Sequence, residues 1–175
     1  WTLPSDIILT VNGSETYAKA NYDGYVVIMA EALMDTVLGE GNYEIIERMK
    51  GKDLEYVHYE PLFPFMEKYP NAYFVTCDDY VTLTDGTGIV HTSYAYGEED
   101  YRVCKKYGVP FSQNVDATGH FTAEAGPFEG LFVKDADDKI LDYMRENGTL
   151  FAALPFEHSY PFCWRCDTPL LYYAR

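Results

Sequence analysis

The sequence predicts an α+β fold that is mainly β, in which short strands form a closed or nearly closed β-barrel decorated with helices. Short β-rich runs recur with turn signals about every ten residues, and only three segments combine helix formers with helix-ending signals. The regular alternation of strands and helices that builds a doubly wound parallel sheet is missing. A barrel with three helices therefore fits the pattern better than an open parallel sheet.

The composition limits what such a fold does. The 175 residues suffice for one domain, and 47% of them are hydrophobic, which is enough for a core. A net charge of −15 argues against a surface that grips nucleic acid by charge alone, because phosphates need clustered Lys and Arg. No apolar run approaches the roughly 20 residues of a membrane helix, and no signal peptide is recognisable. We expect a cytoplasmic protein without membrane contact.

The first half of the chain is predicted to be mainly strands. Asn12-Gly13 is a two-residue hairpin signal, so the runs on either side of it are expected to pair. Ala30 to Leu38 has good helix formers and stops at Gly39. The chain begins at Trp1 without a Met, as expected for a piece excised from a longer protein. The predicted strands are Ile7 to Val11, Thr16 to Ala20, Tyr25 to Ile28, Tyr43 to Met49, Tyr56 to Tyr59, Ala72 to Thr76 and Tyr80 to Leu83.

The second half holds two predicted helices among turns and short strands. Glu99 to Tyr107 is expected to be helical and closed by Gly108, and Ala136 to Asn147 is expected to begin at an Asp135 N-cap. The predicted strands and hairpin are Ile89-Val90, the hairpin near Ala117-Thr118-Gly119, Leu150 to Leu154, and Leu170 to Tyr173.

Chemistry is expected in the stretch from Thr84 to Tyr101. Its glycines admit positive φ and the close approach of a backbone or ligand. His91 stands where a strand runs into a loop, and Asp100 stands at a helix start, where the dipole favours an ionised carboxylate. Two plainer interpretations stay open, a structural histidine and a helix-start acid without further role. The hydroxyls expected to help are those of Thr2, Thr84, Thr87 and Thr92.

Cys163-Trp164-Arg165-Cys166 has the spacing of half a four-ligand zinc site. His158 is a possible third ligand. Cys77 and Cys104 are isolated and are expected to be buried free thiols. The absence of a disulfide framework in the sequence fits a reducing compartment. A zinc-dependent structural adaptor is one hypothesis that follows.

Four blocks in order along the whole chain resemble the isoleucyl-tRNA synthetases, which are class I aminoacyl-tRNA synthetases. The second block resembles their glycine-rich editing motif, and a His at position 91 favours the isoleucine enzymes over the valine enzymes. The blocks are Trp1-Thr2-Leu3-Pro4-Ser5-Asp6, then Asp85-Gly86-Thr87-Gly88-Ile89-Val90-His91 with Gly97-Glu98-Glu99-Asp100-Tyr101, then Phe132-Val133-Lys134-Asp135-Ala136-Asp137, and His158-Ser159-Tyr160-Pro161-Phe162-Cys163-Trp164-Arg165-Cys166.

The resemblance implies an editing domain inserted in the catalytic body of an ATP-binding synthetase. Residues 1–156 would form this domain, and residues 157–175 would be a tail that leads back to the body. The implied reaction is hydrolysis of valine wrongly attached to tRNA(Ile), with no cofactor for editing. Zinc is implied only for the whole enzyme, where Cys163 and Cys166 would be half a site. The implied partners are the acceptor end of tRNA(Ile) carrying valine and the rest of the synthetase chain.

The same resemblance implies roles for single residues. Asp100, with a lowered pKa, would hold the ammonium of the misattached amino acid, and His91 would line the side-chain pocket. Thr2 would contact the substrate, while a water molecule, helped by the ribose hydroxyl, attacks the ester. These three are the catalytic candidates. The further substrate-binding candidates are Asp6, Gly86, Thr87, Gly88, Tyr94 and Tyr96.

Three departures from the family pattern keep a second hypothesis open. The threonine run that precedes Trp1 in the family lies outside this chain. Asp6 replaces the usual Asn and adds negative charge near the pocket. Ser93-Tyr94-Ala95-Tyr96 replaces the common Ala-Pro-x-x segment, so two tyrosines are expected at the pocket rim. The alternative is therefore a non-catalytic module that binds aminoacyl ends or amino acids without hydrolysing them.

Overall fold

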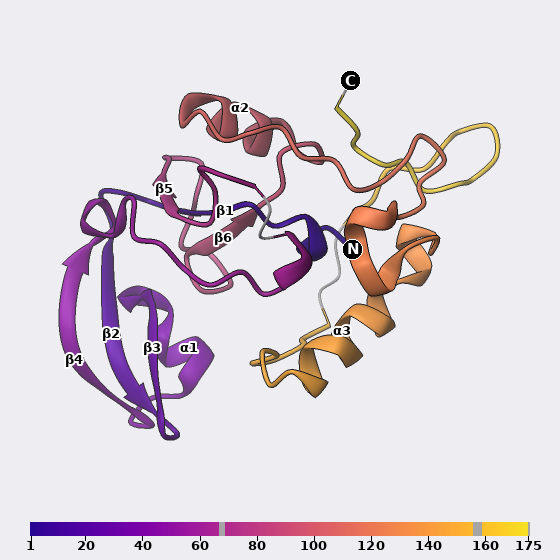
Figure 1. Ribbon diagram of the computed structural model, residues 1–175. Helices are drawn as coiled ribbons and strands as arrows, with labels where there is room; N and C mark the ends of the chain where they lie inside the picture. Colours follow the sequence, from indigo (N-terminus) through magenta and orange to yellow (C-terminus); the bar gives the residue numbers. More distant parts are fainter. Residues whose placement is uncertain (67–68, 156–158, 175) are drawn as a thin grey trace.

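The computed structural model describes residues 1–66, 69–155 and 159–174, and its strands form two separate three-stranded sheets (Figure 1). In sheet A, the central strand β1 (Ile8–Val11) pairs in parallel with β5 (Val75–Cys77) and antiparallel with β6 (Ile89–Thr92). Leu9 of β1 stands opposite His91 of β6. Buried residues at nearly every position of β1 suit a strand that is covered on both faces.

Sheet B projects to one side of the molecule as an antiparallel ribbon (Figure 1). Its central strand β2 (Thr16–Tyr22) lies between β3 (Tyr25–Ala30) and β4 (Tyr43–Lys50). β2 and β3 are joined by Asp23 and Gly24, both at positive φ (46° and 80°), as a two-residue hairpin turn requires.

The predicted hairpin between Ile7 to Val11 and Thr16 to Ala20 is wrong. β1 and β2 are the central strands of different sheets, and both edges of each are occupied by other strands. Asn12-Gly13 instead leads the chain from one sheet to the other. The mixed α+β class is confirmed, but the described strands form two small sheets and do not confirm a closed barrel.

Several predicted strands are wrong because they find no partner strand. Tyr56 to Tyr59 contributes only a single bridge, between His58 and Phe74. Ala72 to Thr76 is reduced to β5, since Tyr73 has a φ of 60° that breaks the extended run. A β-rich composition becomes a strand only where an edge is available. The other runs without a described strand are Tyr80 to Leu83, Leu150 to Leu154 and Leu170 to Tyr173.

Three α-helices complete the described fold, namely α1 (Met34–Leu38), α2 (Glu98–Lys106) and α3 (Asp137–Glu146). The last two confirm the predicted helices to within one residue at each end. The helix predicted from Ala30 is shorter, because Glu31–Leu33 forms a 3-10 turn before α1. In the described part of the chain, no helix has the length and apolar character needed to cross a membrane.

Short 3-10 turns connect these elements. Asp135 lies in one of them, and Ala136 occupies the N-cap position of α3 without a side-chain cap, so the predicted Asp135 cap is wrong. The dipole of α3 meets acids of its own first turn instead, Asp137 and Asp138. The 3-10 turns are Leu3–Ser5, Glu31–Leu33, Gly51–Leu54, Pro64–Met66, Ala123–Phe128 and Val133–Asp135.

Three buried apolar clusters support the elements. One lies under sheet B around Tyr17 and Met29. The second includes Ile8 of sheet A and Val103 of α2. The third joins α3 to the loops before it and is centred on Phe128. The N-terminal turn therefore lies where the second and third clusters meet, since Ile7 belongs to the second and Leu3 packs against the third.

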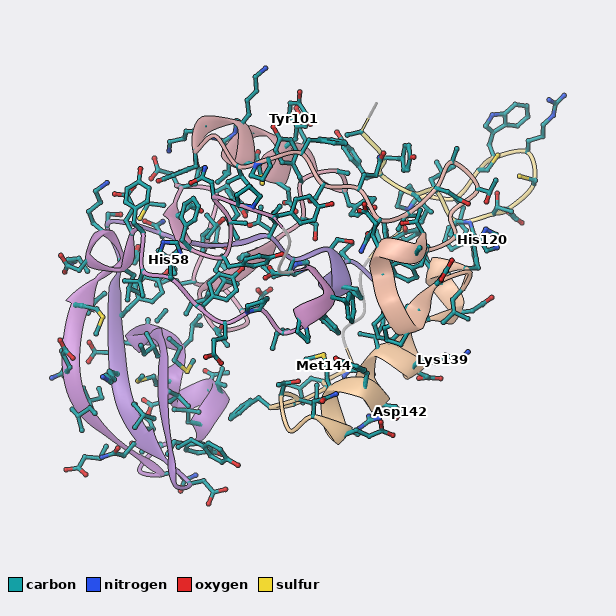
Figure 2. All side chains as sticks on the ribbon, viewed as in Figure 1. His58, Tyr101, His120, Lys139, Asp142 and Met144 are labelled. Atoms are coloured by element: carbon teal, nitrogen blue, oxygen red, sulfur yellow. The ribbon has the colours of Figure 1, made fainter. Side chains whose placement is uncertain are left out.

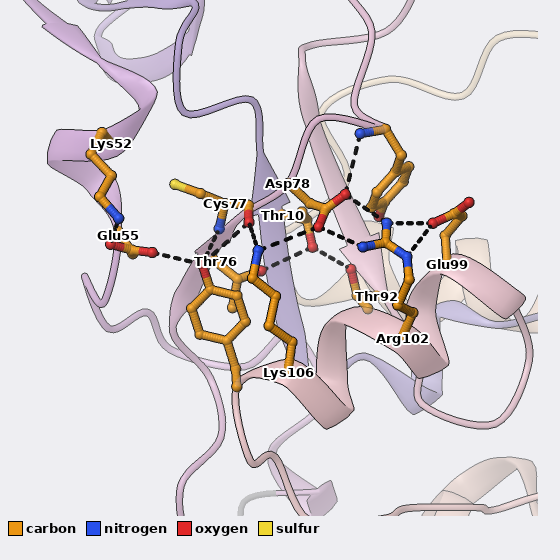
Figure 3. Close-up of polar contacts among 12 residues, drawn as sticks. Thr10, Lys52, Glu55, Thr76, Cys77, Asp78, Thr92, Glu99, Arg102 and Lys106 are labelled. Carbon is orange, nitrogen blue, oxygen red and sulfur yellow. Dashed lines mark hydrogen bonds and ion pairs between the residues drawn. The ribbon is translucent and has the colours of Figure 1, made fainter.

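An ion pair between a buried carboxylate and an exposed arginine fastens α2 to sheet A (Figure 3). Asp78, directly after β5, accepts hydrogen bonds from Nη1 and Nη2 of Arg102 at 2.9 and 2.6 Å. Lys106 Nζ lies 3.5 Å from Oδ2 of the same carboxylate. The hydrogen bonds from Arg102 lower the pKa of Asp78. This bidentate contact fixes α2, and with it the position of Asp100 in the first turn.

Three buried threonines connect the strands of sheet A (Figure 3). Thr10 Oγ1 of β1 lies 3.0 Å from Thr76 Oγ1 of β5 and 2.8 Å from Thr92 Oγ1 of β6. The Thr92 hydroxyl, expected to help the chemistry, is thus engaged inside the sheet. Because side chains alternate along a strand, the preceding His91 points to the opposite face.

Candidate functional site

The N-terminal turn and β6 meet through two side chains. Thr2 Oγ1 lies 3.0 Å from His91 Nε2. Two residues after His91, Ser93 Oγ donates a hydrogen bond of 3.0 Å to the Thr2 carbonyl. The 3-10 turn Leu3–Ser5 follows Thr2 and bends the chain into β1. Thr2 is therefore held on both sides by residues of the β6 end.

Asp100 joins the same group of residues through the backbone of Ser93. The Ser93 N–H donates to Asp100 Oδ2 at 2.8 Å. Burial raises the pKa of Asp100, and the Ser93 hydrogen bond only partly opposes this. The predicted lowering of this pKa is wrong, because desolvation of the carboxylate outweighs the favourable helix start. In the described part of the chain, no basic side chain forms an ion pair with Asp100.

Asp6 lies behind His91. It accepts a hydrogen bond of 2.6 Å from the Tyr59 hydroxyl at Oδ2, and its Oδ1 lies 3.7 Å from His91 Nδ1. Burial raises the pKa of Asp6 to about 7. The expected negative charge is therefore present only in part at neutral pH. Burial, with a smaller effect of the Trp1 ammonium, lowers the pKa of His91 to about 4, so its ring is neutral there.

These contacts form a polar network that runs from α2 through the loop and the N-terminal turn to β6, in which His91 and Asp6 are neighbours at 3.7 Å without a hydrogen bond between them. It brings together Thr2, His91 and Asp100, the three predicted catalytic candidates. Sequence reasoning missed Ser93 as the link and Tyr59 as the partner of Asp6. In the sequence, Ser93 stands out only as a departure from the family pattern, and Tyr59 carries no local signal. In order along the network the residues are Asp100, Ser93, Thr2, His91, Asp6 and Tyr59.

The glycine turn before β6 lies apart from this network. Gly86 and Gly88 both have positive φ (66° and 74°), as the sequence predicts. A Cβ on Gly88 would lie 2.6 Å from Ala30 Cβ, and Ala30 N–H donates to the Thr87 carbonyl at 2.9 Å. Gly88 and His91 are roughly 10 Å apart at the usual strand rise. The close approach made here is thus to sheet B.

Tyr94 and Tyr96 are both buried rather than placed on a rim. The Tyr94 ring packs edge-on against Tyr101 at 5.3 Å between centroids. The Tyr96 hydroxyl accepts from the Asn114 and Val115 N–H groups at 3.2 and 3.0 Å. The two tyrosines therefore fasten the loop to the core, so their expected place on the pocket rim is wrong.

Cys163 and Cys166 lie in one turn, where the Cys166 Sγ is 3.0 Å from Thr168 Oγ1. Within the described ranges, no three His, Cys, Asp or Glu side chains come together as a metal site. The possible third ligand, His158, lies outside the described residues. His58 and His120 lie on opposite sides of the molecule and converge on no common site (Figure 2).

No family model matches the chain. It is 49% identical over 175 residues to an isoleucine–tRNA ligase of Clostridium kluyveri and 51% identical to that of Clostridium acetobutylicum. An isoleucine–tRNA ligase of Bacillus thuringiensis is 46% identical over 99% of the chain.

By its sequence, the chain corresponds to one segment of the isoleucine–tRNA ligases. It spans 17% of the length of the curated relatives it matches. The resemblance found in the sequence motifs is thereby confirmed.

Two solved structures have a similar fold. The solved structure of GlLeuRS-CP1 superposes with a TM-score of 0.68 at 18% identity, over 88% of this chain and 80% of that one. The editing domain of the P. knowlesi cytosolic leucyl-tRNA synthetase superposes with a TM-score of 0.61 at 12% identity, over 85% and 79%. The chain therefore has the fold of an aminoacyl-tRNA synthetase editing domain.

Proposed function

We propose that this chain is an editing domain that hydrolyses the ester of valyl-tRNA(Ile), which is post-transfer proofreading in protein synthesis. The observation that supports this most is the contact of Thr2 with His91, joined through Ser93 to Asp100. Three residues named by one hypothesis thus belong to a single network. Its partners would be the acceptor end of tRNA(Ile) and the rest of a cytoplasmic synthetase chain.

Asp100 is the proposed ligand of the substrate ammonium. Its carboxyl is partly buried, the negative charge of Glu99 adds to the rise in its pKa, and it has no cationic partner among the described residues. A bound ammonium supplies the missing positive charge and favours the ionised carboxylate. The Ser93 N–H holds Oδ2, and the ammonium is proposed to bind at Oδ1, which lies beside Gly97. His91 and Thr2 are proposed to contact the side chain and the ester.

The reason for a second, hydrolytic site is physical. A pocket built for isoleucine rejects valine by only about 1–3 kcal/mol, since the two differ by one methylene. A smaller pocket that hydrolyses valine esters adds a second selection by size. The neutral His91 ring is a suitable wall for such a pocket, because it is uncharged and held by Thr2.

Deacylation of valyl-tRNA(Ile) and isoleucyl-tRNA(Ile) by this chain tests the proposal. We expect the valine ester to be cleaved well above its spontaneous rate and the isoleucine ester to remain at that rate. Equal cleavage of both would exclude a size-selective editing site. Binding of a non-hydrolysable valyl-adenosine analogue without any ester turnover would favour the binding module over the hydrolase.

Zinc is proposed only for the whole enzyme. Cys163 and Cys166 offer two thiols in one turn, which suits half of a tetrahedral site. The other ligands would come from outside the described residues. No step of the proposed hydrolysis uses the metal.

A further inference from the structure

Two buried polar atoms face each other behind the contact of Thr2 with His91. Asp6 Oδ1 lies 3.7 Å from His91 Nδ1, and neither atom has a hydrogen-bond partner among the described residues. This distance is too long for a hydrogen bond, and an unpartnered buried polar atom is costly. A proton on either Asp6 Oδ1 or His91 Nδ1 would let the two atoms form a hydrogen bond and remove this cost.

We propose that Asp6 sets the tautomer of His91 and, through it, the direction of the Thr2 hydroxyl. In the first state, the Asp6 carboxyl is protonated at Oδ1 and donates to His91 Nδ1 after a small rotation of the side chains. The ring proton is then on Nε2 and is donated to Thr2 Oγ1. The O–H of Thr2 is left free to donate to a ligand.

In the second state, Asp6 has lost its proton to solvent. A carboxylate oxygen facing the Nδ1 lone pair is repulsive, so the single ring proton moves from Nε2 to Nδ1 and is donated to Asp6. His91 Nε2 is then an acceptor, and Thr2 donates its O–H to it. Thr2 can now only accept a hydrogen bond from a ligand. The partner of one ring nitrogen thus fixes what the other nitrogen offers.

The groups around the pair place this change near neutral pH. Asp6 carries the titration, because its pKa is raised by burial to about 7 while that of His91 is lowered to about 4. The Tyr59 hydroxyl donates to Asp6 Oδ2 at 2.6 Å and favours the carboxylate. The other groups acting on the pair are the Thr92 backbone, the Asp100 carboxyl, the Cys104 thiol and the Trp1 ammonium.

The inference adds to the proposed function, because it makes Asp6 a positioning residue that acts through His91 on Thr2. It is tested on the ¹⁵N-labelled chain by two-bond ¹H–¹⁵N correlation, which shows which ring nitrogen of His91 holds the proton. Between about pH 5 and pH 9, we expect the proton to pass from Nε2 to Nδ1 with a midpoint near pH 7.

Two substitutions sharpen the test. Asp6→Asn keeps the shape and offers an amide N–H to Nδ1 at every pH, with its carbonyl taking the Tyr59 hydroxyl, so His91 should stay in the Nε2–H form throughout. Tyr59→Phe removes a hydrogen bond that stabilises the carboxylate, so the midpoint should move to higher pH. His120, which lies outside the network, is the control and should behave alike in all three proteins.

An unchanged His91 tautomer across this pH range in the unsubstituted chain would overturn the inference. A pH-dependent change that persists in Asp6→Asn would overturn it as well. If Asp6→Asn does not fold, the unsubstituted chain and Tyr59→Phe still decide, because both keep the Asp6 carboxyl. The measurement involves no ester, so its failure leaves the proposed hydrolysis untouched, and a lack of hydrolysis leaves this result untouched.

Discussion

Thr2 Oγ1 lies 3.0 Å from His91 Nε2, although the two residues stand 89 positions apart in the sequence. The contact joins the N-terminal turn to the end of β6. Ser93 extends it to Asp100 in the first turn of α2. Two interpretations of His91 were open from the sequence, and this contact favours the functional one, because the other end of the hydrogen bond is itself a candidate residue.

For stability and deacylation, the hydroxyl group of Thr2 is predicted to matter more than the shape of its side chain. Thr2→Val keeps the volume and removes the hydrogen bond to His91, so we expect a loss of about 1 kcal/mol in unfolding free energy and slower deacylation of valyl-tRNA(Ile). Thr2→Ser keeps the hydroxyl and should retain most of both. Urea unfolding and deacylation rates check this. A valine variant as stable and as active as the unsubstituted chain would show that the contact is incidental.

The stability of the chain should carry two opposing pH dependences. The folded pKa of Asp6 is raised to about 7, so the folded state binds more protons than the unfolded one, and stability falls as pH rises towards 7. The folded pKa of His91 is lowered to about 4, so the unfolded state binds more protons, and stability rises with pH up to the ordinary value near 6.5.

Replacing either Asp6 or His91 should leave only the pH dependence that the other residue contributes. His91→Gln leaves the Asp6 contribution, so unfolding free energy measured in urea should fall steadily from about pH 4 to pH 7. Asp6→Asn leaves the His91 contribution, so the same measurement should rise between about pH 4 and pH 6.5. Identical pH slopes in the two variants would contradict the assigned pKa shifts.

Gly88 is predicted to be structural. Gly88→Ala would place a methyl group 2.6 Å from Ala30 Cβ at a φ of 74°, so we expect a loss of at least about 1 kcal/mol in unfolding free energy. Gly86→Ala is the matched control, since its φ is similar (66°) but no atom lies within 4 Å of the added Cβ. Denaturant unfolding of both variants separates the backbone strain at positive φ from the clash with Ala30. Equal losses would mean that the approach of sheet B contributes nothing.

Tyr96 is predicted to act on stability and not on substrate choice. Tyr96→Phe leaves the buried N–H groups of Asn114 and Val115 without their acceptor, which costs about 1–3 kcal/mol. Tyr94→Phe keeps its ring contacts with Tyr101 and Phe111 and is the control. Thermal unfolding measures the cost, and the ratio of valine to isoleucine ester cleavage should stay the same. A changed ratio of valine to isoleucine ester cleavage in Tyr96→Phe would show that Tyr96 contributes to substrate choice.

Features set by neighbours in the sequence could be predicted. Helix α2 follows from its acidic start and the Gly108 stop, and the glycine turn before β6 from its two glycines. Strand pairing could not be predicted from the sequence. Asn12-Gly13 is a local hairpin signal, but the strands that pair with β1 are β5 and β6, which come much later in the chain. Which strands pair with a central strand depends on residues that are far away in the sequence.

The charge states of the site residues could likewise be predicted only in part from the sequence. A helix dipole can be read from the sequence and favours an ionised Asp100. Burial cannot be read locally, and it raises the pKa of this carboxyl instead. Tyr59 and Ser93 complete the network through contacts 53 and 91 positions away in the sequence, to Asp6 and Thr2. No spacing rule connects residues so far apart.

Deacylation of valyl-tRNA(Ile) by Asp100 variants tests the central claim most directly. Asp100→Asn keeps an oxygen for the Ser93 N–H but loses the charge, and Asp138→Ala removes an exposed acid from the first turn of α3 as a control. Loss of a buried charged contact costs about 2 kcal/mol or more, so we predict that Asp100→Asn slows cleavage by roughly 30-fold or more while Asp138→Ala does not. Unaltered cleavage by a folded Asp100→Asn chain would contradict the account.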